Sequence, residues 1–303
     1  MTAKRHHAVP QFYLRRFANS KGMLWLHDIE RLTAGLVHTS NAMVEKYLYS
    51  PEVGDDPHDD SIERFLAEHV EGPAASPLEK LANGDVLSSE ERQHLATFLA
   101  FQEARIPRMR DNVTSFASEL GQKILNLSIA HPESMKAALA KKGHPIPDAI
   151  LAHLSEAVRT GGIRVEATKM AWLQATLGTG EIAEMLFRMP WFVVEAYPGV
   201  EFLTSDAPIV KVLTDRSVPR QFAGGWLSPS SEATFALDPF RCLVIRPDGK
   251  EGRGRVSKLW CKNVNSRLVS QAKRFVGSSS RDGYVESIGA RRPKRSSLRQ
   301  AAL

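Results

Sequence analysis

The sequence predicts an α+β fold in which N-terminal and central helices pack with a mainly antiparallel C-terminal sheet. Over about residues 1–188, apolar residues recur at spacings of three and four, the period of an amphipathic helix. Over about residues 189–288, short β-branched and aromatic runs alternate with turns, which is typical of antiparallel strands. We therefore expect a single α+β domain over residues 1–288. Residues 289–303 are basic and poor in apolar side chains, which predicts a disordered tail.

The chain opens with the run HHAVPQFYLRRF. Pro10 fits the first turn of a helix, where its missing N–H costs nothing, and Tyr13, Leu14 and Phe17 follow on one apolar face. The residue before a proline favours an extended backbone, so we expect His7 in an extended lead-in across the start of the helix. A histidine there can act as a general base, a general acid or a metal ligand. A solvated basic tail ahead of an ordinary amphipathic helix is the alternative.

The next part of the chain combines a strand, an acidic loop and several helices. A short strand is predicted at residues 23–30. The loop at residues 51–60 is rich in aspartate and could bind magnesium or manganese, but it lacks the ligand spacing of a calcium loop, which favours a solvated linker. Helical spacing then predicts a series of helices at about residues 61–71, 110–127, 132–142, 147–159 and 166–188, the last interrupted near residues 178–180.

The clearest helix start is the capping box S-x-x-E at Ser88 and Glu91. The helix that follows has Arg105 on its otherwise apolar face, and a guanidinium buried there must be paired. Its candidate partners are Glu63 and Glu71 on the preceding helix. Two interpretations remain, a structural ion pair between helices and an anion-binding arginine. Pro107 then ends or kinks the helix.

A second polar segment, TSDAP at residues 204–208, lies at the end of a predicted strand. Asp206 either accepts a backbone N–H in an Asx-turn, or orients His7, or binds a metal beside it. Asn265, on a helix predicted at about residues 258–274, could donate to the same turn. A structural and a functional interpretation therefore remain for both side chains.

The string H-x-V-P-x-x-Y-L-x-x-F, which begins at His7, resembles the opening of a widespread, mostly bacterial family known as domain of unknown function 4238. Shorter similarities follow at IE…E (Ile62, Glu63 and Glu71), QEARIPRMR (102–110), FLTSDAPI (202–209) and VN (264–265). The resemblance covers roughly residues 4–277. It implies no particular activity, but it singles out the polar members of these motifs.

On this resemblance we expect one pocket that unites four polar side chains: His7, Arg105, Asp206 and Asn265. Candidate metal ligands are His7, Asp206, Glu63 and Glu71, with magnesium or manganese as the expected ion. The alternative is that the four side chains make separate, fully paired structural contacts.

Several enzyme classes are disfavoured because their motifs are missing from the sequence: G-x-x-x-x-G-K-[ST], G-x-G-x-x-G after a strand, H-E-x-x-H and G-x-S-x-G. Cys242 and Cys261 have no zinc-ligand spacing and form no disulfide framework, so we expect buried, reduced thiols. No stretch approaches the roughly 18–20 apolar residues of a membrane span. No signal-peptide pattern is present, so we expect a cytoplasmic protein.

The net charge of +6 favours a polyanionic partner such as nucleic acid. We expect a hydrolase of nucleic-acid phosphodiesters, a nuclease serving in bacterial defence. In this interpretation His7 is the acid or base, Arg105 steadies developing negative charge, and Asp206 orients the histidine or binds a divalent ion. The alternatives are a non-enzymatic module that binds nucleic acid or protein, with a structural opening segment, and an enzyme acting on a small molecule.

Overall fold

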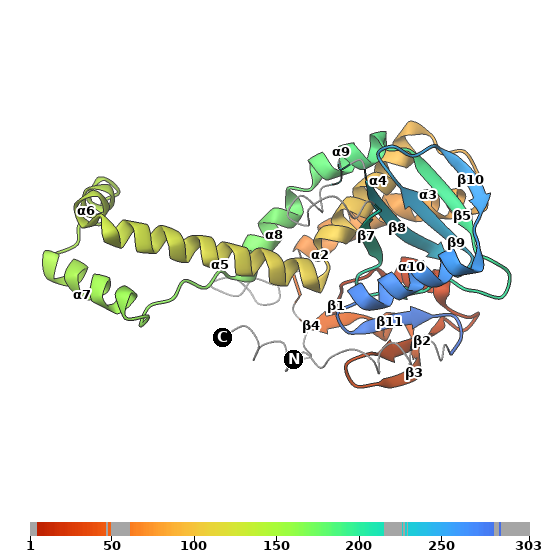
Figure 1. Cartoon of the computed structure of the whole chain (residues 1–303), viewed down its shortest axis with the longest axis horizontal. Helices are drawn as coiled ribbons and strands as arrows, with labels where there is room; N and C mark the ends of the chain where they lie inside the picture. The colour runs from red at the N-terminus through yellow and green to blue at the C-terminus, as the bar shows by residue number, and fades with distance from the viewer. Residues whose placement is uncertain are drawn as a thin grey trace. The chain divides into compact units, whose positions relative to one another are not determined.

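The computed structural model describes residues 5–46, 48–49, 61–214, 226, 228, 230–281 and 285 (Figure 1). By its internal contacts the chain divides into two compact units. The first unit comprises Met1–Arg108 and Thr176–Leu303, and the second comprises Met109–Ala175. Helices and antiparallel-rich sheets together make the protein α+β, which confirms the predicted fold class. The single domain expected over residues 1–288 stays a prediction.

The N-terminal part of the first unit contains strands as well as helices. The predicted opening helix is confirmed, as α1 (Gln11–Leu14) followed by a 3-10 turn, η1 (Arg15–Phe17). The strands are β1 (Arg5–His7), β2 (Met23–Asp28), β3 (Thr33–His38) and β4 (Val44–Lys46), and η2 (Thr39–Asn41) lies between the last two. Only β2 was expected from the sequence. The other strands form because the folded chain supplies their partners. β3, for example, pairs with β2, and β2 pairs on its other side with β11 (Phe275–Ser278), a strand about 250 residues away.

Two larger sheets and one strand pair hold the first unit together. One sheet has the order β3-β2-β11-β6 and is antiparallel throughout. The other has the order β10-β5-β9-β8-β7 and is antiparallel except where β10 runs parallel to β5. The remaining strands are β5 (Trp191–Glu195), β6 (Thr204–Ser205), β7 (Ile209–Leu213), β8 (Ser231–Asp238), β9 (Arg241–Ile245) and β10 (Gly252–Arg255). The predicted mainly antiparallel sheet is thereby confirmed.

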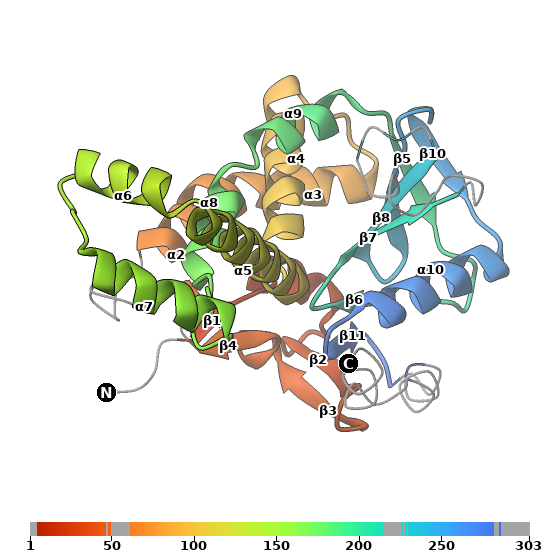
Figure 2. The same cartoon turned by 60° about the vertical axis from the view of Figure 1, so that its left-hand side comes forward.

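Helices α3 (Gly72–Asn83), α4 (Ser89–Ala104) and α9 (Gly180–Arg188) pack beside one another (Figure 2). The capping box of α4 is present, since the Ser88 Oγ accepts the Glu91 N–H at 3.2 Å and the Glu91 carboxylate accepts the Ser88 N–H at 2.9 Å. α4 ends at Ala104, and Pro107 begins the next helix, as expected of a proline.

The predicted helix at residues 61–71 is confirmed with one irregularity. It comprises α2 (Ser61–Leu66) and a π-helical turn, η3 (Ala67–Glu71), which leads directly into α3. Pro73 lies one residue into α3, where it has no N–H to donate and its ring crowds the carbonyl four residues earlier. The chain widens there, and the Gly72 N–H bonds to the Ala67 carbonyl, five residues back.

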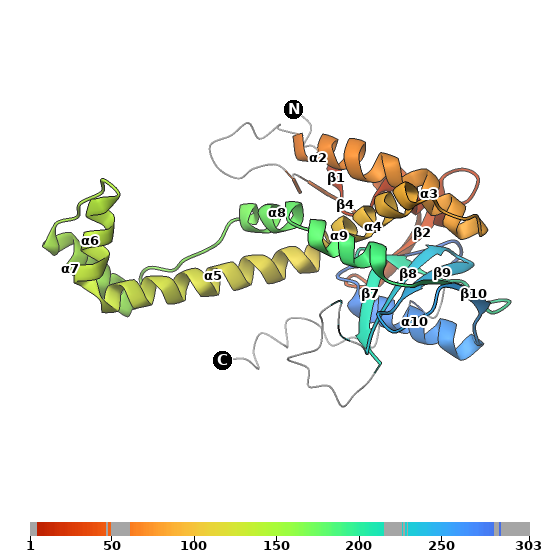
Figure 3. The same ribbon diagram turned by 90° about the horizontal axis from the view of Figure 1, so that it is seen from above.

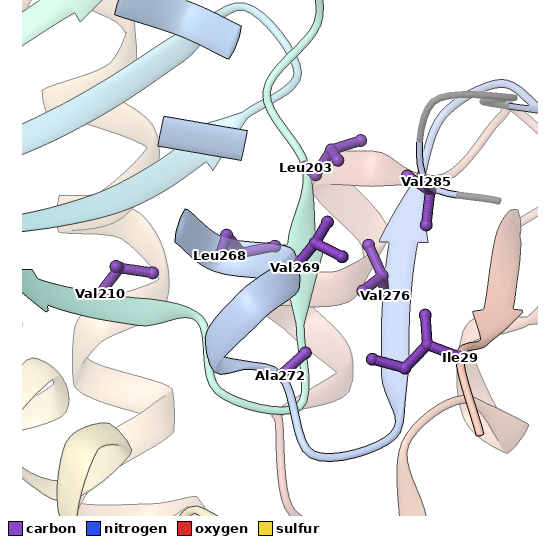
Figure 4. Packing of buried hydrophobic residues seen from close by; sticks show 8 residues of the cluster. All are labelled: Ile29, Leu203, Val210, Leu268, Val269, Ala272, Val276 and Val285. Atoms are coloured by element: carbon purple, nitrogen blue, oxygen red, sulfur yellow. The ribbon is translucent and has the colours of Figure 1, made fainter. Parts of the chain in front are cut away.

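Helix α10 (Lys258–Gln271) contributes to an aliphatic core cluster that also includes residues from the two larger sheets (Figure 4). This cluster consists of Ile29, Leu203, Val210, Leu268, Val269, Ala272, Val276 and Val285.

Strand β11 passes close to its neighbours at Gly277. A Cβ at that glycine would lie 2.9 Å from a methyl carbon of Leu24 and 2.9 Å from the Thr204 methyl group. Glycine therefore permits the tight strand pairing there.

The second unit is helical. It contains most of α5 (Pro107–Ala130), all of α6 (Pro132–Lys141) and α7 (Asp148–Arg159), and most of α8 (Lys169–Leu177). These helices and the break before α9 match the sequence prediction. The connection from α7 to α8 runs beside α5 (Figure 3): the Val165 N–H donates to the Gln122 side chain and the Ala167 N–H to the Ser118 hydroxyl, each at 2.9 Å.

None of the described helices has the length and apolar character needed to cross a lipid bilayer. Both cysteines are free and buried, as expected. The acidic loop at residues 51–60 and the basic tail at residues 289–303 lie outside the described residues.

Candidate functional site

The backbone at the start of the opening motif is held from several sides. β1 pairs antiparallel with β4, which sets His7 opposite Val44. The Ala8 N–H donates to the Met43 carbonyl at 3.2 Å, and the Ala8 carbonyl accepts from Gln102 Nε2 at 3.2 Å. The Tyr49 hydroxyl donates to the His7 carbonyl, also at 3.2 Å. These contacts fix where the His7 ring emerges from the chain.

Tyr13 is a structural anchor of the same motif. Its ring is fully buried and stacks on Phe235 of β8 at 4.8 Å between ring centroids. Its hydroxyl donates to the Ala236 carbonyl at 2.9 Å and accepts from the Thr204 hydroxyl at 3.0 Å. Burial raises the pKa of Tyr13 far above its ordinary value, so the phenol stays neutral. Tyr13 therefore ties the opening helix to both larger sheets.

A cavity of about 310 Å³ lies beside the opening motif, and most of its wall is polar or charged. That volume is at the lower end of the range for small-molecule sites, roughly 300–1,000 Å³. Except for Tyr49, which lies outside the helices and strands, the residues that line it belong to elements described above: β1, α1, η1, α2 and η3. The polar residues of the wall are His7, Gln11, Arg15, Tyr49, Glu63 and Glu71.

His7 lines this cavity, and one nitrogen of its ring is not hydrogen-bonded within the described residues. Its Nε2 is buried and has no hydrogen-bond partner among the described residues, so the hydrogen bond to the Thr39 backbone is made by Nδ1. Burial lowers the pKa of His7 below the ordinary 6.5, although the Thr39 hydrogen bond and the Glu71 charge oppose that shift. The ring is therefore neutral at pH 7. With Nδ1–H donating to the backbone, the Nε2 lone pair is available to accept a proton.

His6 points to the opposite side of β1 and is fully buried. Its Nδ1 accepts the Tyr49 N–H at 3.0 Å, and its ring stacks on the Tyr49 ring at 5.5 Å. Its Nε2 lies 3.3 Å from a carboxylate oxygen of Glu63, which is half-exposed and lines the cavity. Burial raises the pKa of Tyr49 to about 12, so that hydroxyl also remains protonated. His6 therefore positions two residues of the cavity wall.

Arg105 is fully buried, and its guanidinium is committed to neighbouring side chains. Nη1 donates to Glu71 at 2.6 Å, while Nε and Nη2 both donate to Gln102 Oε1, at 3.0 and 2.7 Å. Burial by itself would lower the pKa of Arg105, but Tyr49 and Glu71 raise it above its ordinary value. The expected ion pair is confirmed with Glu71, whereas Glu63 pairs with His6. Arg105 supports the cavity from behind rather than lining it.

Asp206 serves the backbone that connects α10 to β11. Its carboxylate accepts the N–H groups of Lys273, Arg274 and Phe275 at 2.7, 2.7 and 2.9 Å. Burial raises the pKa of Asp206, and these three N–H groups oppose the rise. Asp206 therefore holds this connection in place. It is not among the residues that line the cavity beside His7.

Asn265 makes a comparable clamp on a neighbouring loop. Its Nδ2 donates to the Glu201 carbonyl at 2.7 Å, and its Oδ1 accepts the Leu203 N–H at 3.2 Å. The expected single pocket is therefore not formed. His7 and Arg105 belong to one site through Glu71 and Tyr49, while Asp206 and Asn265 satisfy backbone groups elsewhere. Their catalytic roles stay predictions.

The candidate metal ligands are also divided. Among the described residues, no group of three or more histidine, cysteine, aspartate or glutamate side chains is arranged to hold a metal ion. Glu63 and Glu71 line the cavity with His7, whereas Asp206 does not. Sequence reasoning missed Tyr49 and Arg15 at this site. Arg15 could have been found from the sequence, because its spacing places it in the opening helix. Tyr49 could not, because no sequence signal places it against His6.

The fold and the site define an α+β protein whose N-terminal segment brings a neutral, partly buried histidine to a small polar cavity. The family model described as "Protein of unknown function (DUF4238)" matches residues 5–282, and the chain belongs to that family. Searches of curated proteins and of solved structures found no match to the chain.

Proposed function

We propose that the cavity beside His7 is the active site of a hydrolase that cleaves phosphodiester bonds in nucleic acid. The observation that carries the proposal is that His7 lines a polar cavity and that its ring, kept neutral by a lowered pKa, has an Nε2 atom without a partner among the described residues. A general base works best when it is unprotonated at the working pH and unoccupied by other hydrogen bonds. Of the four side chains expected at the site, His7 alone has this property.

In the proposed reaction His7 Nε2 accepts a proton from a water molecule, whose oxygen then attacks the phosphorus atom. The phosphorus–oxygen bond to the leaving group breaks, and solvent supplies the proton for the leaving oxygen. The Nδ1 hydrogen bond to Thr39 supports the imidazolium that forms. Glu71, already paired with Arg105, presents less negative charge to an approaching phosphate than a free carboxylate would.

Arg15 is the group proposed to bind the phosphate. Its side chain is exposed and belongs to the cavity wall. A guanidinium matches phosphate oxygens in a two-point contact, which a lysine ammonium does not reproduce. The net charge of +6 adds a general attraction for polyanions.

Cleavage of DNA and RNA panels, with and without magnesium or manganese, tests this proposal. His7→Gln is expected to lower the cleavage rate by about 10²–10⁴-fold, the usual contribution of a general base. The matched control is His144→Gln, an exposed histidine in the second unit. Wild-type protein that leaves every substrate intact would contradict the proposal, as would equal rates for the two variants.

A second candidate function is a non-enzymatic module that binds nucleic acid, in which the opening motif is structural. The observation in its favour is that Tyr13, Gln102, Arg105, Asp206 and Asn265 all satisfy other parts of the chain. It predicts binding without cleavage and an affinity that falls steeply with salt. Deleting residues 289–303 should then weaken binding and flatten the salt dependence. Unchanged affinity would remove the tail as the contact surface.

A further inference from the structure

Helix α5 carries a row of large apolar side chains in the second unit that the rest of the described chain leaves exposed. Phe116 is 67% exposed, Leu127 64% and Ile124 56%. With Leu120, they fall within about 80° of one another around a helix of 3.6 residues per turn. Monomeric soluble proteins rarely expose a contiguous apolar patch of this kind. We call these four residues the α5 stripe.

The opposite face of α5 is already covered within the same unit. The connection between α7 and α8 bonds to Ser118 and Gln122. Gly121, between them, lies so close to Val165 that an added Cβ would be 2.7 Å from a methyl group. Both covered positions point away from the α5 stripe. The helix thus has one packed face and one open face, so the open face is available to a partner.

Two charged residues occupy the same edge of the α5 stripe. Glu119 and Lys123 are four residues apart and both exposed, so they lie next to each other along that edge. The other edge offers Ala117, Gly121 and Ser128, which carry no charge. One edge of the α5 stripe is therefore charged and the other is not. Along the charged edge, the negative Glu119 precedes the positive Lys123.

We propose that the α5 stripe is an interface with a second copy of this chain, in which the two α5 helices pack antiparallel. Setting Phe116 against Leu127 of the second copy also brings Leu120 within one residue of Ile124, so the row is complementary to itself. In an antiparallel pair the same edge of each helix meets. Glu119 then comes within one residue of Lys123 of the second copy, and the two-fold axis repeats the pair.

A parallel pair does not use these charges. It brings opposite edges of the two helices together, so Glu119 and Lys123 would face the uncharged edge. The self-complementary row and this charge pattern together point to a second copy as the occupant and to the antiparallel direction.

Sedimentation velocity of the full-length protein over a concentration series tests the interface. Leu120→Glu should raise the dissociation constant of the dimer by about tenfold or more, because it places a charge in the centre of the contact. Ile150→Glu is the matched control, since Ile150 of α7 is 50% exposed and Leu120 46%. A monomeric wild type would overturn the proposal, and so would equal effects of the two variants. Circular dichroism confirms that each variant retains its helices.

Charge exchange tests the pairing. Glu119→Lys alone and Lys123→Glu alone should each weaken self-association, and an equimolar mixture of the two variants should recover a dimer at least as tight as the wild type. A mixture no tighter than the separate variants would overturn the charge pairing.

Direction is tested by single cysteines. Phe116→Cys and Leu127→Cys should form an intermolecular disulfide when the two variants are mixed. If each variant instead cross-links with itself and the mixture gives no additional product, the antiparallel arrangement is overturned.

Discussion

The surroundings of His7 and the surroundings of Asp206 both contain buried polar groups from the family-like motifs, but they differ in what those groups are bonded to. The Asp206 carboxylate accepts three backbone N–H groups, and Asn265 nearby uses both its donor and its acceptor. At the cavity, Arg105 is paired just as completely, yet His7 keeps a buried nitrogen without a partner among the described residues.

This difference separates side chains that hold the fold from a side chain that can do chemistry. A buried polar atom is costly unless it is hydrogen-bonded, so full pairing is the expected state of a structural residue. An unpaired nitrogen beside a cavity is retained against that cost. Polar residue type and motif membership did not distinguish the two regions, whereas hydrogen bonding does.

The largest expected effect comes from removing the paired cation at the cavity. Arg105→Ala should lower the free energy of unfolding by about 3–5 kcal/mol, because it leaves Glu71 and Gln102 without their buried partner. Urea denaturation measures the loss. Arg108→Ala, an exposed arginine three residues on, should change stability by no more than about 0.5 kcal/mol. Similar values for the two variants would show that the buried network is not a structural element.

Asp206 should rank next. Asp206→Ala removes the acceptor of three backbone N–H groups and should cost about 2–3 kcal/mol of unfolding free energy. Asp206→Asn keeps one acceptor oxygen and should cost less. If the proposed function is right, the folded fraction of either variant retains the cleavage rate per molecule. A rate that falls as far as in His7→Gln, measured on fully folded protein, would restore Asp206 to the active site.

Asn265→Ala should have a smaller effect, about 1–2 kcal/mol, because it breaks two neutral hydrogen bonds to the backbone of Glu201 and Leu203. Thermal and urea unfolding provide the measurement, and the cleavage rate should again be unchanged. A loss of activity without a loss of stability would contradict the comparison between the two regions.

The smallest expected effect is the pH dependence contributed by His7. Its pKa in the folded protein lies below the ordinary 6.5, so the unfolded chain binds more protons between those two values. Stability should therefore rise with pH across that window and level off above 6.5, and His7→Gln should lack this part of the slope. The cleavage rate should likewise decrease at acid pH, with a midpoint below pH 6.5. Identical stability–pH curves for the variant and the wild type would rule out a lowered pKa.

The sequence by itself determined much of the helical structure. The capping box at Ser88 and Glu91, the apolar face of the opening helix and the end of α4 before Pro107 were all readable, because they depend on neighbours within a few residues. The change to short β-branched runs after Pro190 predicted the antiparallel strands in the same way. A buried, paired Arg105 also followed from its position on an apolar face.

Tertiary structure alone decided which polar residues were available for function. Asp206 is bonded to backbone more than 60 residues away, and β2 pairs with a strand about 250 residues away. Tyr49 meets His6 and His7 only because β1 pairs with β4. Local patterns report the preferences of a segment, but whether a polar atom is satisfied depends on partners that only the folded chain brings near. His7 became the candidate base for that physical reason.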